Sequence, residues 1–300
     1  MEAIWSNRTR NHLTPTSNNY IQPVARFKFS YTHTTMRLLK IAIAIILVVT
    51  AVSNGHAGLL NTDNADPVEA GHLEIELNGS HSHDRDSSGG VTTRTRSTDG
   101  DLTATVGLAD GLDASVSAPY TARTSREVDG QDTGRYDGFN DLAIAAKYRF
   151  LDASGLKLAV KPALLLPTGR SSEGLSDGRP GYSLAIIATR EFAQGKIAIN
   201  ANLGYERHNY RDKASQDANR CTIYTGSIAA EAELADGLKL GLDAGLATNA
   251  DRTSNTPLGY ALAGATYELA KAIEVYAGGR FGLTRPEADL AALFGAKLKF

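Results

Sequence analysis

Leu290-Ala291-Ala292-Leu293-Phe294-Gly295-Ala296-Lys297-Leu298-Lys299-Phe300, at the end of the chain, alternates between two kinds of position. Successive side chains of an extended strand point to opposite faces, so one face carries Phe294, Leu298 and Phe300. The other face carries both lysines. The stretch therefore predicts an amphipathic strand with one apolar face.

The same alternation with a period of two recurs along the chain, which predicts twelve strands in all. The other eleven are expected at residues 73–77, 101–108, 112–118, 142–150, 156–166, 182–188, 197–205, 228–234, 238–246, 260–269 and 273–281.

The connections between these strands alternate in length. Tight links are expected at 109–111, 152–155, 193–195, 235–237 and 270–272. Long polar loops are expected at 79–100, 121–140, 168–181, 207–220 and 247–257. Short turns at one end, long loops at the other and an even strand number are typical of transmembrane barrels, with both termini on the periplasmic side.

The predicted fold is therefore all-β, a transmembrane antiparallel up-and-down barrel of about twelve strands. A soluble β-sandwich or a lipocalin-like barrel is the alternative. It is disfavoured because the polar faces hold many small residues and mixed charges, as a wet lumen would. Aromatic residues near the strand ends also suit a membrane interface. They are Tyr120, Tyr148, Phe150, Tyr182, Phe192, Tyr205, Phe281 and Phe300.

The first 57 residues are expected to lie outside the barrel. Residues 36–57 have the basic start, the apolar run Ile41–Val52 and the small residues before Gly58 that are typical of a cleaved signal peptide. A membrane helix is the alternative, but this run is too short to span a bilayer. Residues 1–35 are interpreted as a spurious extension from an early start codon or as a disordered leader. The barrel is expected over residues 58–300.

Charge and cysteine content exclude some functions. The chain has a net charge of −2, and subtracting the +5 of residues 1–57 leaves −7 on residues 58–300. An acidic body argues against a nucleic-acid partner. Cys221 is the only cysteine, so no intrachain disulfide can form, and an inert thiol is expected.

Several short motifs occur in the order of a known family. They are Leu60–Ala65, Gly71–Leu77, Lys147–Phe150, Leu165–Gly169 and Asn202–Tyr205. Their order resembles the outer-membrane "transporter" family named for the meta-pathway of phenol degradation. The resemblance implies an outer-membrane channel for small aromatic or hydrophobic compounds. A terminal strand closed by Phe300 likewise resembles outer-membrane barrels, in which that residue is an assembly signal for the barrel assembly machinery.

The candidate functional residues are charged side chains on the lumen faces in the periplasmic half. They are Glu74, Glu76, Lys147, Arg149, Lys157, Glu191, Glu231, Glu233, Lys239, Glu274, Lys297 and Lys299. One interpretation is a zone that sets the electrostatic selectivity of a pore. The other is structural ion pairing, which the nearly equal numbers of the two signs favour.

Ser80-His81-Ser82-His83-Asp84 contains residue types used in catalysis and metal binding. It is expected in a flexible loop, where a triad or a metal site is hard to hold. We therefore predict a protein that is not an enzyme, without a cofactor or metal.

The function predicted from the sequence is passive passage of small molecules through the bacterial outer membrane. A surface barrel with a structural or adhesive role, and an outer-membrane hydrolase, are the alternatives. Twelve strands predict a narrow or partly plugged pore. Residues 58–70 are expected either to form the plug or to lie in the periplasm. Outer-membrane lipid, lipopolysaccharide, the assembly machinery and a small solute are the expected partners.

Overall fold

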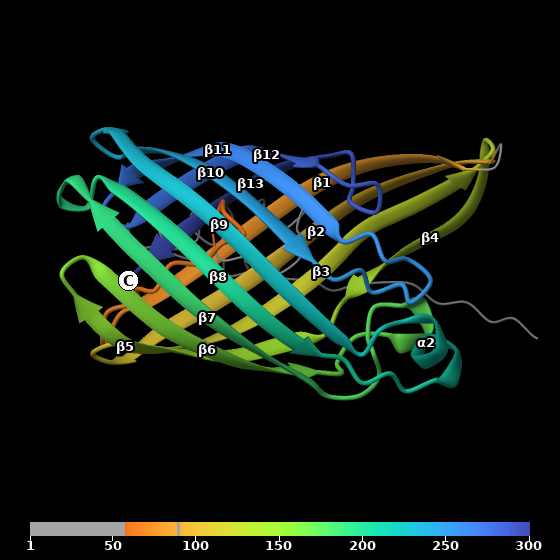
Figure 1. Ribbon diagram of the computed structural model, residues 1–300, viewed down its shortest axis with the longest axis horizontal. Helices are drawn as coiled ribbons and strands as arrows, with labels where there is room; N and C mark the ends of the chain where they lie inside the picture. Colours follow the sequence, from red (N-terminus) through yellow and green to blue (C-terminus); the bar gives the residue numbers. More distant parts are fainter. Residues whose placement is uncertain (1–57, 89–90) are drawn as a thin grey trace, which may run out of the picture. The chain divides into compact units, whose positions relative to one another are not determined.

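The structure is a computed structural model that describes residues 58–88 and 91–300, most of which lie in β-strands (Figure 1). The strands are β1 (Leu73–Ser88), β2 (Val91–Ala109), β3 (Leu112–Val128), β4 (Gln131–Phe139), β5 (Leu142–Ala153), β6 (Leu156–Leu166), β7 (Gly181–Phe192), β8 (Ile197–Arg207), β9 (Thr222–Ala235), β10 (Leu238–Ala247), β11 (Leu258–Ala270), β12 (Ile273–Gly282) and β13 (Leu290–Lys299). Helix α2 (Lys213–Ala218) and the 3₁₀ turns η1 (Ser171–Glu173) and η2 (Ala193–Gly195) lie between strands.

The strands form one closed antiparallel sheet, and the predicted twelve-stranded barrel is confirmed. Strands β4 and β5 together occupy one of the twelve positions, because β4 pairs with the distal half of β3 and β5 with its proximal half. The first and last strands close the ring. Glu74 lies opposite Lys299 and Glu76 opposite Lys297, so opposite charges of the two lumen faces meet at the closure.

Tight turns connect strands at one end of the barrel, as predicted. The repeated sequence Leu-Ala-Asp-Gly-Leu forms two of them. Gly111 and Gly237 adopt φ angles of 74° and 73° there, in the left-handed region that glycine enters without a Cβ clash. The first and last strands are joined at this end by main-chain hydrogen bonds between Leu73 and Phe300.

Two predicted loops are wrong. Residues 79–100 and 121–140 are mostly strand, because β1, β2 and β3 continue far beyond the predicted ends and β4 joins them. These extensions are polar on both faces and rich in threonine, which favours strands. An apolar alternation could not reveal them. In Figure 1 they project past the rim formed by the other strands.

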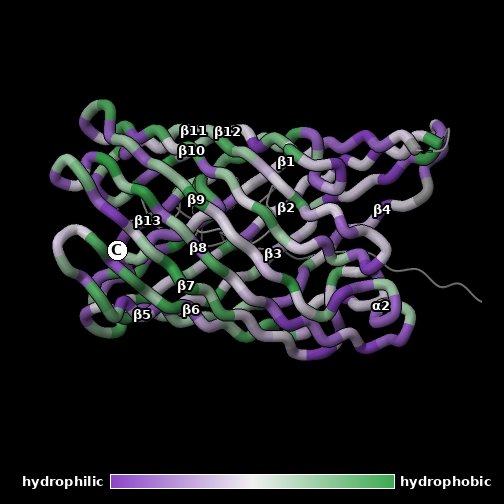
Figure 2. Tube along the Cα trace, in the orientation of Figure 1, coloured by the Kyte–Doolittle hydropathy of each residue, from purple (hydrophilic) through white to green (hydrophobic). Residues whose placement is uncertain are grey.

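The outer face of the barrel is apolar. Leu203, Leu242 and Leu246 are 68%, 63% and 56% exposed, which suits lipid rather than water as the surrounding medium. Figure 2 shows hydrophobic residues along the membrane-spanning strands and hydrophilic residues over α2 and the ends of β1–β4. Aromatic side chains are exposed near the rims, among them Tyr148, Phe150, Tyr182, Phe192, Phe281 and Phe300.

The remaining long loops occur near their predicted positions, at residues 167–180, 208–221 and 248–257. No helix in the described part of the chain is long and apolar enough to cross a membrane. The predicted leader and signal peptide fall on residues 1–57, outside the described residues.

Candidate functional site

The segment before β1, residues 58–70, lies inside the barrel and is called the plug below (orange in Figure 1). Of the two predicted places for this segment, the lumen is therefore the observed one. The C-terminal end of the plug is fixed to the wall by a bridge between Ala70 and Gly107. A hydrogen bond from Gly71 N to the Gly107 carbonyl oxygen, 2.9 Å, supports the same connection. A Cβ at Gly107 would lie 1.9 Å from the Glu69 carbonyl oxygen, so only glycine permits this approach.

The N-terminal end of the plug is anchored by apolar contacts. Leu59 and Leu60 are 6% and 5% exposed and pack against lumen side chains of β9, β11 and β12. These side chains are Ala229, Tyr260, Leu262 and Tyr276. Glycines leave space for the two leucines: a Cβ at Gly241 would lie 2.9 Å from Leu60, and one at Gly278 would lie 2.7 Å from Leu59.

The middle of the plug is held by polar side chains of the wall. Asp243 accepts hydrogen bonds from Thr62 N and Thr62 Oγ1, both at 2.8 Å. Ala65 N donates to Thr189 Oγ1 at 2.9 Å, and Val68 N donates to Asp113 Oδ2 at 2.9 Å. These three plug N–H groups thus find acceptors on the wall, which limits the cost of burying them.

The carboxylate of Asp63 lies between two lysines from adjacent strands. Lys147 Nζ on β5 is 3.2 Å from Oδ1, and Lys161 Nζ on β6 is 2.8 Å from Oδ2. The Lys147 ammonium also donates to the main-chain oxygens of Asn64 and Asp66, at 3.2 and 3.1 Å. Charge-assisted hydrogen bonds of this kind are the stronger ones in proteins.

Asp66 is held in the same way by a second pair of cations. Arg149 Nη1 lies 2.5 Å from Oδ1, and Lys157 Nζ lies 2.9 Å from Oδ2. These cations have further acidic partners on the wall, since Lys157 also contacts Glu191 at 2.7 Å. Arg149 lies 3.5 Å from Asp152 and 3.8 Å from Asp110.

The structure divides the twelve predicted lumen charges into three groups. Lys147, Arg149, Lys157 and Glu191 belong to the contacts with the plug. A second group lies along β1, β12 and β13 and comprises Glu74, Glu76, Glu274, Lys297 and Lys299. The third, Glu231, Glu233 and Lys239, lines a cavity. What these groups do for a solute remains a prediction.

The second group spans the closure of the barrel. Lys297 Nζ lies 3.6 Å from Glu74 and 3.7 Å from Glu76, and Lys299 Nζ lies 2.6 Å from Glu274. Glu76 is buried and also accepts a hydrogen bond from the Tyr276 hydroxyl at 2.7 Å. The charges therefore pair across strands, as the structural interpretation of the sequence expects.

Two small polar cavities flank the plug. One, of about 140 Å³, is lined by Asp66, Glu191 and the third group of charges. The other, of about 220 Å³, is lined by plug residues Asp63 and Asp66 and by wall residues that include Asp113, Lys147 and Lys161. The lumen beside the plug is thus polar and charged, with only small cavities.

The sequence did not identify Asp63, Asp66, Lys161 or Asp243 as site residues. A signal for Asp63 was present in the family motif at Leu60–Ala65, which has no strand around it; Asp66 directly follows this motif. Lys161 and Lys157 are the two charged residues of β6, which is otherwise apolar, and both face the lumen. A charge placed there implies a partner, because a lone charge in a narrow interior is costly.

The segment Ser80–Asp84 lies on strand β1 and not in a flexible loop, contrary to the expectation. Because neighbouring strand residues face opposite sides, Ser80, Ser82 and Asp84 point away from His81 and His83. His81 Nδ1 instead pairs with Thr98 Oγ1 on β2, at 2.9 Å. Within residues 58–88 and 91–300, no three His, Cys, Asp or Glu side chains are arranged to hold a metal ion.

A histidine links two loops at the extracellular rim. His208 Nδ1 lies 2.7 Å from Asp177 Oδ2, and Nε2 lies 3.4 Å from Glu206 Oε2. The hydrogen bonds to Asp177 and then to Glu206 raise the pKa of His208 to about 10. The imidazolium is therefore charged at neutral pH and ties the loop after β6 to the loop after β8.

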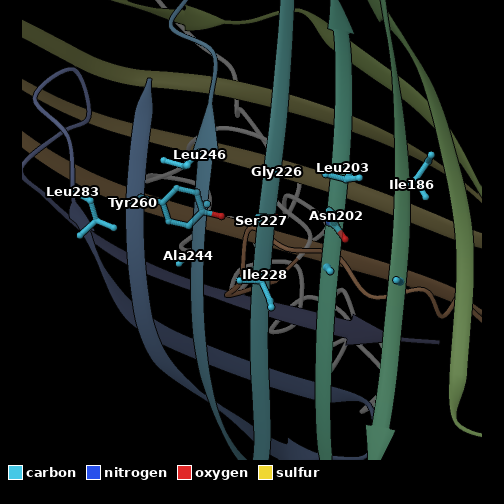
Figure 3. Close-up of a pocket in the computed structure, with 13 residues that line it drawn as sticks. Ile186, Asn202, Leu203, Gly226, Ser227, Ile228, Ala244, Leu246, Tyr260 and Leu283 are labelled. Atoms are coloured by element: carbon cyan, nitrogen blue, oxygen red, sulfur yellow. The ribbon is translucent and has the colours of Figure 1, made fainter. Parts of the chain in front are cut away.

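One wide hollow lies on the outer surface of the barrel and not in the lumen. Its volume is about 710 Å³, and its apolar walls are formed by outward side chains of β7 to β10 and of Leu283 (Figure 3). Ile186, Leu203, Ile228 and Leu246 are all more than half exposed. In a bilayer this hollow faces lipid chains, so it is not part of a path through the barrel.

Comparison with solved structures shows the fold. The crystal structure of the COG4313 outer membrane channel from Pseudomonas putida F1 is 16% identical, with a TM-score of 0.66, over 79% of this chain and 98% of that one. The NanC porin is 12% identical, with a TM-score of 0.51, over 75% and 100% of the two chains. The β domain of the Bordetella autotransporter BrkA is 16% identical, with a TM-score of 0.50, over 77% and 100%.

These neighbours share the barrel of bacterial outer-membrane proteins, and the apolar outer face agrees with that location. A search of curated proteins gives no match. A family model, by contrast, matches residues 62–300, which include most of the plug and the whole barrel. The chain belongs to the family described as "Putative MetA-pathway of phenol degradation".

Proposed function

We propose that this protein is an outer-membrane channel for the passive passage of small molecules, and that the plug is its moveable obstruction. The observation that carries the proposal is how the plug is held. Up to Val68, every hydrogen bond described between plug and wall uses a wall side chain, so the plug is not a strand of the sheet. It can leave without breaking the wall.

The lumen supports this proposal. Charged groups of both signs and two polar cavities line the plugged region, and hydrated side chains in a barrel interior suit the passage of a polar or amphipathic solute. Two solved structures with the same fold are named a channel and a porin. The family name supports aromatic compounds as solutes.

A reversible cross-link tests the proposal. Thr62→Cys with Asp243→Cys, in a Cys221→Ser background, joins the plug to the wall at a contact that now measures 2.8 Å. We expect the oxidised protein to conduct poorly in planar bilayers and the reduced protein to conduct more. A variant that carries Asp243→Cys and Cys221→Ser but keeps Thr62 controls for the loss of the Asp243 carboxylate.

Equal conductance of the oxidised and reduced forms would show that the plug is not an obstruction. The channel function itself is wrong if the oxidised form, the reduced form and a variant lacking residues 58–66 all fail to conduct while each migrates as a heat-modifiable barrel.

A surface role is the second candidate, and the long hairpins of β1–β4 favour it. They extend a polar sheet past the rim, and Arg285 ties Asp86 of β1 to the loop after β12 at 2.6 Å. Loss of cell-surface binding after removal of residues 84–97, with conductance intact, would support this role in addition to transport.

Assembly through the C-terminal residue is also part of the proposal. Phe300 is 63% exposed and joined to Leu73 by main-chain hydrogen bonds at the closure. We propose that the barrel assembly machinery recognises it and that lipopolysaccharide surrounds the extracellular half. Deletion of Phe300 should lower the yield of inserted barrel more than it changes the stability of the barrel that does form.

A further inference from the structure

We propose that Lys147 and Lys161 form a binding site for small molecules that carry a carboxylate on an apolar body, and that Asp63 occupies this site in the closed channel. The inference rests on the proposed channel function and names a class of solute for it. The plug would then act as a built-in competitor of the solute.

The geometry is that of a bound carboxylate. The two lysines project from adjacent strands, and each ammonium contacts a different oxygen of Asp63, at 3.2 and 2.8 Å. All three side chains are largely shielded from solvent: 10% of Lys147, 29% of Lys161 and 16% of Asp63 is exposed. Partial burial strengthens each charge-assisted contact relative to one in water.

The charge balance singles out this pair of lysines among the plug contacts. In the described residues, Asp63 is the only carboxylate within ion-pair distance of Lys147 or Lys161. Asp113 lies close by on the same cavity, but it accepts the hydrogen bond from Val68 N. Glu74 and Glu76 line the cavity too, but they make their ion pairs with Lys297. Without Asp63, both ammonium groups would therefore have no carboxylate at ion-pair distance in the described residues.

The second carboxylate of the plug provides a contrast. Asp66 contacts Arg149 and Lys157, which keep Asp152, Asp110 and Glu191 as wall partners. Without Asp66, these two cations would still be neutralised. The site at Lys147 and Lys161 therefore depends on an acid from outside the wall, and the site at Arg149 and Lys157 does not.

The apolar half of the proposed ligand follows from the other anchor of the plug. Leu59 and Leu60, four and three residues before Asp63, cover Tyr260, Tyr276 and the glycine positions of the wall. Their departure exposes an apolar surface in the same lumen. The cavity beside Asp63 measures about 220 Å³, more than the roughly 150 Å³ that can hold benzene in an engineered protein cavity.

Two matched variants, Asp63→Asn and Asp66→Asn, test the site in the full chain. Planar bilayers under a KCl gradient give the ion preference, and benzoate with benzamide as the neutral analogue gives the ligand preference. We expect Asp63→Asn to shift the ion preference toward anions relative to the wild type. It should be blocked by benzoate at roughly tenfold lower concentration than by benzamide, since benzamide lacks the charge-assisted contact. Asp66→Asn should resemble the wild type.

Adding Lys161→Gln to Asp63→Asn should remove the preference for benzoate. Similar shifts in the two aspartate variants, or equal block by benzoate and benzamide, would overturn the carboxylate site while leaving the channel function standing. If every variant forms a heat-modifiable barrel and none conducts, the channel function fails, and the solute site fails with it.

Discussion

The wall and the plug are built from the same chain but are held by different bonds. The wall is a closed ladder of main-chain hydrogen bonds from β1 to β13, whereas the plug up to Val68 is held by wall side chains. A ladder in lipid cannot open, because each unpaired main-chain group costs several kcal/mol there. Side-chain contacts can be exchanged for water or a solute. Motion is therefore expected in the plug and not in the wall.

The largest effect should come from a charge on the outside of the wall. Leu242 is 63% exposed to lipid, and Leu242→Arg should lower the free energy of unfolding by about 2–4 kcal/mol. Thr105→Arg is the matched control, because Thr105 lines the cavity of about 220 Å³ and lies opposite Glu74. Urea titration in vesicles should show a much smaller loss for the control. Equal losses would mean that the inner and outer faces are assigned wrongly.

A charge reversal at the closure should have the next largest effect. Lys297→Glu places a carboxylate beside Glu74 and Glu76, so stability should fall by about 1–2 kcal/mol. Adding Glu74→Lys restores one opposite pair and should recover part of the loss in the same titration. If the double variant is no more stable than the single one, these charges do not couple β1 to β13.

Gly241→Val should show most clearly that the stability of the wall and the docking of the plug are independent. The three atoms nearest to a Cβ at this position all belong to Leu60, the closest at 2.9 Å, so the plug must shift. The strand itself should gain up to about 1 kcal/mol, because valine favours β-structure more than glycine does. We expect unchanged or higher barrel stability together with faster proteolysis of residues 58–70. A destabilised barrel with a plug that stays protected from protease would contradict this independence.

The smallest effect concerns the rim loops. The raised pKa of His208 means that its contribution to stability is fully present below pH 6.5 and is lost as the pH rises toward 10. Limited proteolysis of the loops after β6 and β8 should therefore accelerate over that range, with little change in the melting of the wall. In the His208→Gln variant, the protease should cleave these loops at a rate independent of pH. A persistent pH dependence would point to another titrating group.

Much of the wall could be predicted from the sequence, because alternate apolar residues face lipid directly. The lumen positions of Glu74, Glu76, Lys297 and Lys299 followed from the same pattern, and the structure pairs these charges across the closure. The hairpins of β1–β4 could not be found in this way. Their two faces are both in water, so residues such as Arg94 and Thr95 carry no alternation.

The site was only half predictable for a related reason. Lys147, Arg149 and Lys157 were identified as lumen charges from their strand positions, but their partners lie in a segment without periodic structure. Asp63 and Asp66 reach them by a path that runs through the inside of the barrel. Such contacts between residues about 80 to 100 positions apart depend on the closed fold and have no local sequence pattern.

The bridge between Ala70 and Gly107 has a consequence for the concentrations at which a solute could act. It keeps the released plug tethered a few residues from its docking surface, and short flexible tethers give effective concentrations in the millimolar range. A free solute must compete with this tethered ligand. Its apparent affinity therefore falls as the effective concentration of the plug at the docking surface rises. A channel built in this way would respond to abundant solutes and stay closed to scarce ones, without any separate sensor.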